Sequence, residues 1–160
     1  MKWIAILMAV IMVASAAGAG YLYLNSTIRV DKLGVVATEA ALQQASFDEL
    51  KRQAEGGRVI GTLYSHEPIG ESADYQFLTY TVRLDNRTAL TADMVEVAVT
   101  AQPQDVLQIG DEKPKALQGR SQGDISATIL TTKGSNTIRE LTVTYYIWGI
   151  PFSIKTAYRH

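Results

Sequence analysis

The chain opens with a long run of apolar residues and then changes to alternating apolar and polar positions. From Trp3 to Leu24 no residue is charged. A helix of these 22 residues would be about 33 Å long at roughly 1.5 Å per residue, and the hydrocarbon core of a bilayer is about 30 Å thick. The pattern therefore predicts a transmembrane helix in residues 1–24 and a separate domain in residues 25–160.

Two interpretations of this first segment stay open. Ala14-Ser15-Ala16, and a second site at Ala17-Gly18-Ala19, resemble the small-residue site at which a signal peptide is cleaved. Cleavage would release a soluble, secreted domain. Apolar residues nevertheless continue past these sites to Leu24. Trp3 and Tyr21 also stand near the two ends of the segment, where aromatic side chains meet the membrane interfaces. We therefore favour a signal anchor that is retained in the mature protein.

Small residues four positions apart indicate how the predicted anchor could pack against another helix. Ala14 with Gly18, and Ala16 with Gly20, follow the small-xxx-small pattern that lets transmembrane helices approach closely. Lys2 favours a cytoplasmic N-terminus. We therefore expect a single-pass protein of the plasma membrane, with its domain on the extracytoplasmic side.

After the apolar segment, the period of the hydrophobic positions is two, which is typical of β-strands with one buried face. The clearest example is Tyr75 to Asp85, where Leu78, Tyr80 and Val82 alternate with polar residues. The resulting fold class is all-β: an immunoglobulin-like antiparallel β-sandwich of seven or eight strands with one short helix. Strands are predicted over residues 28–37, 58–65, 75–85, 94–101, 105–109, 124–132 and 139–148, and from 152 almost to the C-terminus.

Two local features refine this prediction. A change of phase at Asp31–Lys32 predicts a β-bulge in the first strand. Ser46 and Glu49 have the spacing of a capping box and predict the start of the short helix, and Gly56-Gly57 ends it. We expect this helix, which contains Phe47, to cover one end of a sheet. Residues 38–45 either extend the helix backwards or form a separate turn.

Composition removes several classes of function. The chain has no cysteine, which excludes disulfides, thiolate chemistry and cysteine-ligated zinc. Its 15 Lys and Arg residues are balanced by 16 Asp and Glu residues, and we expect no nucleic-acid partner because no basic cluster occurs. An exported domain without disulfides is held together by packing alone, which fits a bacterial cell envelope.

The sequence contains no catalytic, cofactor-binding or metal-binding motif. One internal histidine, His66, cannot supply a metal site without other ligands nearby. The candidate interaction surface is aromatic: Tyr146 and Trp148 share one face of a predicted strand, and Phe152 follows the next turn. These rings either form an exposed platform for a glycan, a peptide or another envelope protein, or they are covered within the sandwich.

These patterns predict a membrane-anchored binding or structural module of a bacterial cell envelope. It is expected to act through protein or glycan contacts, without enzymatic activity and without a cofactor. A small envelope hydrolase acting on carbohydrate or peptidoglycan is the alternative. That activity requires two carboxylates, or His66 with one carboxylate, to converge in the fold. A secreted binding protein would differ only in the cleavage of its leader.

Overall fold

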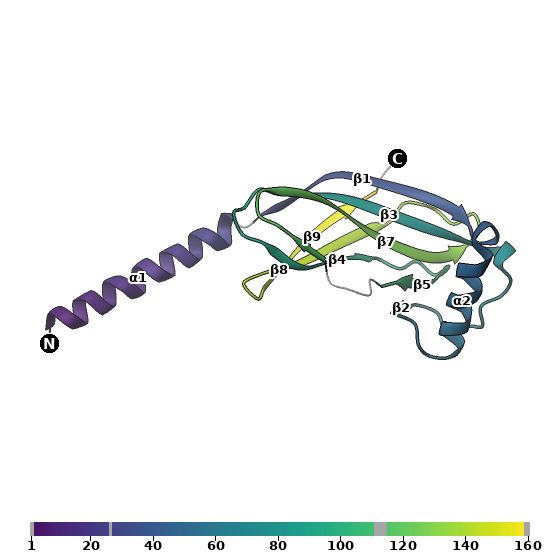
Figure 1. Cartoon of the computed structure of the whole chain (residues 1–160), viewed down its shortest axis with the longest axis horizontal. Helices are drawn as coiled ribbons and strands as arrows, with labels where there is room; N and C mark the ends of the chain where they lie inside the picture. Colours follow the sequence, from purple (N-terminus) through teal and green to yellow (C-terminus); the bar gives the residue numbers. More distant parts are fainter. Residues whose placement is uncertain (1, 26, 111–114, 159–160) are drawn as a thin grey trace.

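The computed structural model describes residues 2–25, 27–110 and 115–158. It consists of one long helix followed by a β-sandwich (Figure 1). Helix α1 (Lys2–Asn25) is exposed along Lys2–Tyr21, which is long and apolar enough to cross a membrane. The predicted apolar helix is therefore present, although a signal sequence near an N-terminus has the same length and polarity.

The described strands form two antiparallel sheets that pack face to face. One sheet has five strands in the order β1-β3-β7-β5-β2, and the other has four in the order β6-β4-β8-β9. The chain is thus mostly β, as the alternation of apolar positions predicts. The strands are β1 (Ile28–Glu39), β2 (Gly61–Leu63), β3 (Tyr75–Asn86), β4 (Ala92–Val99), β5 (Asp105–Ile109), β6 (Lys115–Leu117), β7 (Ser121–Thr132), β8 (Glu140–Ile147) and β9 (Ile150–Ala157).

The main core lies between the sheets and follows directly from the alternation. Successive side chains of a strand point to opposite faces, so every second residue of β3 faces β4 and β8. Tyr80 and Val82 of β3 are fully buried in the same cluster as Val143 of β8. The predicted bulge is confirmed, because the register of β1 against β3 shifts between Val30 and Lys32.

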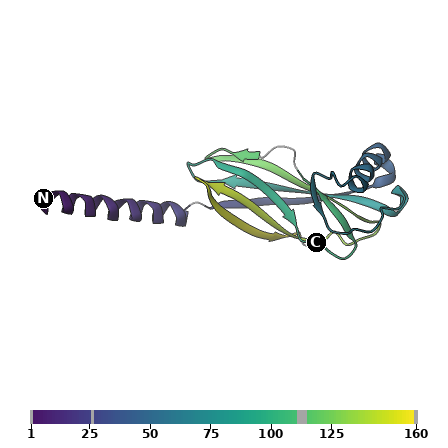
Figure 2. The same cartoon turned by 90° about the horizontal axis from the view of Figure 1, so that it is seen from below.

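A second apolar cluster closes the end of the sandwich that lies away from α1 (Figures 1 and 2). Helix α2 (Gln44–Glu55) follows a 3₁₀ turn, η1 (Ala40–Gln43), and buries Phe47 and Leu50 in this cluster. The predicted short helix at one end of a sheet is therefore present. A further 3₁₀ turn, η2 (Ser72–Asp74), precedes β3.

The start of this helix differs from the prediction. The helix begins at Gln44, so Ser46 lies inside it and the predicted capping box is wrong. Its N-cap, Gln43, makes no side-chain cap hydrogen bond, because the chain enters the helix directly from η1. Glu49 instead pairs with Arg52 and Gln53.

Strand boundaries differ most at the sheet edges. The strand predicted over residues 58–65 is reduced to β2, and β6 was not predicted. Both are three-residue edge strands, too short to show an alternating pattern. Residues 105–109, in contrast, form β5 with the predicted bounds.

Candidate functional site

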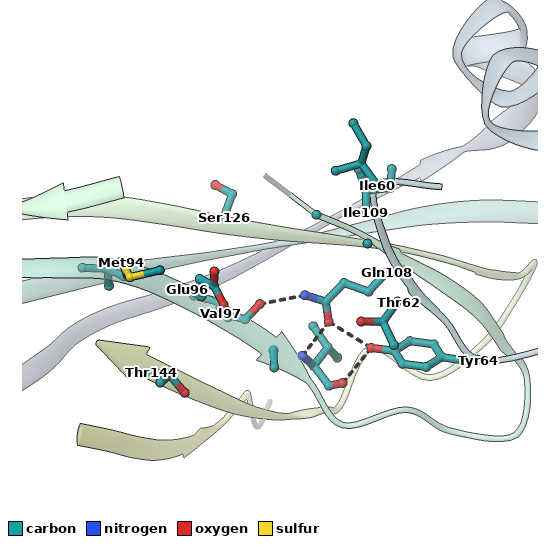
Figure 3. A pocket seen from close by; sticks show the side chains of 15 residues that line it. Ile60, Thr62, Tyr64, Met94, Glu96, Val97, Gln108, Ile109, Ser126 and Thr144 are labelled. Carbon is teal, nitrogen blue, oxygen red and sulfur yellow. Dashed lines mark hydrogen bonds between the residues drawn. The ribbon is translucent and has the colours of Figure 1, made fainter. Parts of the chain in front are cut away.

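A cleft of about 680 Å³ lies at the seam where the five-stranded sheet meets β4 of the other sheet (Figure 3). The registered pairs of β5 with β7 reach only Thr128, where Ile109 lies opposite. On its other edge the same part of β5 pairs with β2, through pairs such as Gly61 with Ile109. The cleft opens where the two sheet edges separate. Among its lining residues are Ile60, Thr62, Tyr64, Glu96, Gln108 and Thr144.

Gln108 of β5 bonds to the backbone of β4 across this seam (Figure 3). Its Nε2 donates to the carbonyl oxygen of Val97 at 2.7 Å, and its Oε1 accepts from the backbone N–H of Val99 at 2.8 Å. A neighbouring antiparallel strand would offer one carbonyl and one N–H to β4 in the same way. The side-chain amide therefore supplies the N–H and the carbonyl oxygen that a neighbouring strand would offer to these two backbone groups of β4.

Tyr64 completes this arrangement. Its hydroxyl lies 2.9 Å from Oε1 of Gln108 and 3.0 Å from the carbonyl oxygen of Val99, and its single proton can be donated to either acceptor. Burial, and secondarily the charge of Asp105, raise the pKa of Tyr64 above its ordinary value of about 10. The hydroxyl is thus neutral and a donor at physiological pH.

The side of β4 that faces the cleft has little strand cover among the described residues. There β6 pairs with β4 only at Ala92 and Val95, with a register shift between them. Val97 and Val99, farther along β4, contact Gln108 and Tyr64 instead. In this half of β4, backbone groups at the sheet edge therefore bond to side chains in place of a neighbouring strand.

A buried ion pair holds β5 against the second sheet. Nη2 of Arg139 lies 2.9 Å from Oδ1 of Asp105, and Nε lies 3.2 Å from Oδ2. Both side chains are fully buried. Asp105 also accepts the backbone N–H of Gln102, while Arg139 donates to the carbonyls of Asn136 and Ile138. The pair fixes the start of β5 beside the start of β8, three residues before Gln108.

Among the described lining residues, Glu96 is the one carboxylate. His66 is exposed in the loop after β2 and does not line the cleft. Within the described residues, no three His, Cys, Asp or Glu side chains gather in a way that could hold a metal ion. The hydroxyl and amide groups present are suited to hydrogen bonding with a neutral ligand.

The structure separates the three aromatic residues of the predicted interaction surface. Trp148 lies in the turn between β8 and β9 with 69% of its surface exposed. Phe152 lies opposite Tyr145, and their rings stack with centroids 5.5 Å apart. Tyr146 lies opposite Pro151 and is half-buried. Because adjacent residues point to opposite faces of a sheet, Tyr146 and Phe152 lie on different faces, and Trp148 is the most exposed of the three.

The small residues of the predicted helix-packing face all lie on exposed positions of α1. Ala14 and Gly18 lie one above the other, as do Ala16 and Gly20. A two-residue offset turns about 200° around a helix, so the two pairs face nearly opposite sides of α1. They form two separate small-residue stripes rather than a single face.

Sequence reasoning missed Gln108, Tyr64 and the Asp105–Arg139 pair. Gln108 stands in a short segment, and its partners on β4 are nine and eleven residues away. Arg139 was predicted at the start of a strand. Nothing in the sequence indicates that it is buried, or that it pairs with Asp105, which lies 34 residues earlier in the chain. Only the packing of one sheet on the other brings these groups together.

Comparisons with protein-family models, with curated proteins and with solved structures found no match to this chain. What the protein does is therefore inferred from its own residues.

Proposed function

We propose that this protein is a membrane-anchored module of a bacterial cell envelope that binds an extended segment of a partner protein in the cleft beside β4. The observation that carries the proposal is Gln108, whose side-chain amide bonds to Val97 and Val99 as a neighbouring strand would. An edge that accepts one amide in this way can accept the peptide groups of an added strand. Helix α1 would hold this cleft at the outer face of the plasma membrane.

Exchange of the Gln108 amide for a peptide segment conserves hydrogen bonds. The carbonyl of Val97 and the N–H of Val99 then bond to the incoming backbone in place of the Gln108 amide. The side chain of Gln108 turns towards solvent, because the cleft is open to solvent. Buried or half-buried polar groups are costly only when they lose partners. An incoming strand of suitable sequence therefore displaces Gln108 without leaving these two backbone groups unpaired.

A polypeptide suits the lining better than a glycan does. Tyr64 is the aromatic residue among the described lining side chains, and its hydroxyl lies against Val99 and Gln108. The apolar side chains of Ile60 and Ile109 flank the polar groups and could contact alternate side chains of an extended segment. The lining thus combines backbone recognition with small apolar contacts.

Binding is favoured over the alternative of an envelope hydrolase. Two-carboxylate hydrolysis needs a second acid at a defined distance from the first, and among the described residues that line the cleft Glu96 is the one carboxylate. A secreted form of the same binding module would differ only in loss of α1. The narrower prediction of an immunoglobulin-like sandwich stays a prediction, because no comparison supports it.

The test is selection of peptides from a random library displayed on phage against the full chain in lipid nanodiscs. Selected peptides should bind the native protein and lose binding to Thr62→Trp, because Thr62 lies opposite Gln108 on β2 and the larger side chain fills the cleft. Ser153→Trp is the matched control, since Ser153 is an exposed strand residue on β9. Its binding should equal that of the native protein.

Two results would contradict the proposal. One is a set of selected peptides that binds Thr62→Trp as well as it binds the native protein. The other is a selection in which no peptide distinguishes the protein from empty nanodiscs. Circular dichroism of both tryptophan variants verifies that each is folded.

A further inference from the structure

The turn between β8 and β9 carries an exposed tryptophan at a position that folding alone does not explain. Ile147 and Ile150 form the last strand pair, and between them Trp148 has a φ of 53° and Gly149 a φ of 77°. Asn-Gly and Asp-Gly are the preferred sequences for such turns, because Asn and Asp tolerate a positive φ. Here the position holds a large apolar ring with 69% of its surface exposed.

This turn lies at the end of the sandwich that is nearest to α1 (Figures 1 and 2). The backbone N–H of Ile28, the first residue of β1, points to the hydroxyl of Tyr145 at 3.4 Å. Strand β8 runs towards α1, and from Tyr145 to Trp148 it advances about 10 Å. The chain from Asn25 to Ile28 spans about 11 Å at most. The tip of the turn therefore reaches roughly the level at which the membrane-spanning helix ends.

The surroundings of the turn are apolar and electrically balanced. Ile150 and Pro151 are exposed beside Trp148, and Met94 is half exposed next to Asp93, which lies opposite Tyr146. A surface of this kind favours contact with the neutral interfacial layer of a membrane over attraction to charged headgroups alone. The charged residues at this end include both signs: Arg29, Arg87 and Arg120 with Asp31, Asp85 and Asp93.

We propose that the Trp148 turn docks on the surface of the bilayer that α1 spans, with the indole ring in the interfacial headgroup layer. Tryptophan is enriched at this depth in membrane proteins, because its ring is apolar and its N–H remains able to hydrogen-bond. The inference rests on α1 as a retained anchor, which is part of the proposed function, and it is independent of the cleft. A second contact beside α1 fixes how the domain is oriented over the membrane.

Tryptophan fluorescence of the full chain in phosphatidylcholine liposomes tests this directly. The chain has two tryptophans, so Trp3→Phe leaves Trp148 as the reporter. We expect its emission to be blue-shifted, to lose most of its intensity when the lipids carry bromine near the headgroups, and to resist acrylamide in the aqueous phase. Because the contact is apolar, added salt should leave this quenching unchanged.

Two controls make every outcome decisive. Trp148→Phe leaves Trp3, whose quenching by brominated lipid verifies that α1 is inserted. In a chain lacking both native tryptophans, Leu42→Trp places the reporter on η1 at the opposite end, where Leu42 is exposed, and there acrylamide should quench it and bromine should not. If Trp3 is quenched by bromine while Trp148 is quenched only by acrylamide, the docking proposal is wrong and the anchor stands. If Trp3 is not quenched, both are wrong.

A second variant separates docking from folding. Trp148→Asn restores the Asn-Gly sequence preferred in this turn, so its thermal stability should equal or exceed that of the native chain. The absence of cysteine allows Leu42→Cys to carry a single fluorophore. Its distance distribution to an acceptor lipid should become broader in Trp148→Asn, and an unchanged distribution would overturn the proposal.

Discussion

The buried pair of Asp105 and Arg139 offers a prediction whose size follows from the structure. Both side chains are fully buried and joined by two hydrogen bonds. Removing one member leaves the other as an uncompensated charge, which costs about 3–5 kcal/mol in such pairs. We expect Arg139→Met to lower the free energy of unfolding by this amount, and Asp105→Leu to do the same.

The double variant should be more stable than either single variant. With both charges gone, the remaining loss comes from groups that bonded to them: the N–H of Gln102 and the carbonyls of Asn136 and Ile138. Asn136 and Ile138 are exposed and can bond to water, so the double variant should lose only about 1–3 kcal/mol. The loss of stability in the double variant should therefore be much smaller than the sum of the losses in the two single variants.

Urea unfolding of the full chain in detergent micelles measures these differences, provided that the slope with urea is the same for all four proteins. The reasoning would be refuted by single variants within about 1 kcal/mol of the native protein, or by a double variant whose loss equals the sum of the singles. Near-ultraviolet circular dichroism shows whether each variant keeps its packed core.

Three further outcomes are expected. Burial raises the pKa of Tyr80 to about 12. The stability that the neutral phenol contributes is therefore complete below about pH 10, its pKa in the unfolded chain, and is lost as the pH rises towards 12. In thermal melts, Tyr80→Phe should lose less stability with rising alkaline pH than the native chain does. Phe47→Ala should cost about 3–5 kcal/mol in urea unfolding, because the ring is buried in the second apolar cluster. Gln108→Leu should cost about 1–2 kcal/mol in the same assay through its two bonds to β4. A change within about 0.5 kcal/mol would contradict either of the last two.

The sequence was most informative where one pattern of apolar positions extends over many residues. The apolar run of α1, the alternation of β3 and the bulge beside Lys32 could all be read because each depends on local geometry. β2 and β6 could not be predicted, since a three-residue strand is defined by its neighbour and not by its own pattern. The start of α2 was misplaced because η1 replaces the side-chain cap that Ser46 seemed to offer.

The cleft lay beyond sequence reasoning for a different physical reason. Gln108 and Tyr64 are ordinary polar residues in polar-patterned segments, and they meet β4 only because two sheets pack together at their edges. The sequence indicated Tyr146, Trp148 and Phe152 together, with Trp148 on a strand. The exposure of Trp148 depends instead on the two-residue turn that follows Ile147. Alternation along β8 and β9 then places Tyr146 and Phe152 on opposite faces.

The most direct test of the account is the mass and location of the chain when it is produced in a bacterium with its own first segment. Membrane and soluble fractions are separated, and the intact mass of the protein is measured in each. The account predicts the uncleaved mass in the membrane fraction, resistant to extraction by alkaline carbonate. A shortened chain in the soluble fraction, beginning near Ala17 or Gly20, would contradict the anchored module and the docking of Trp148 together.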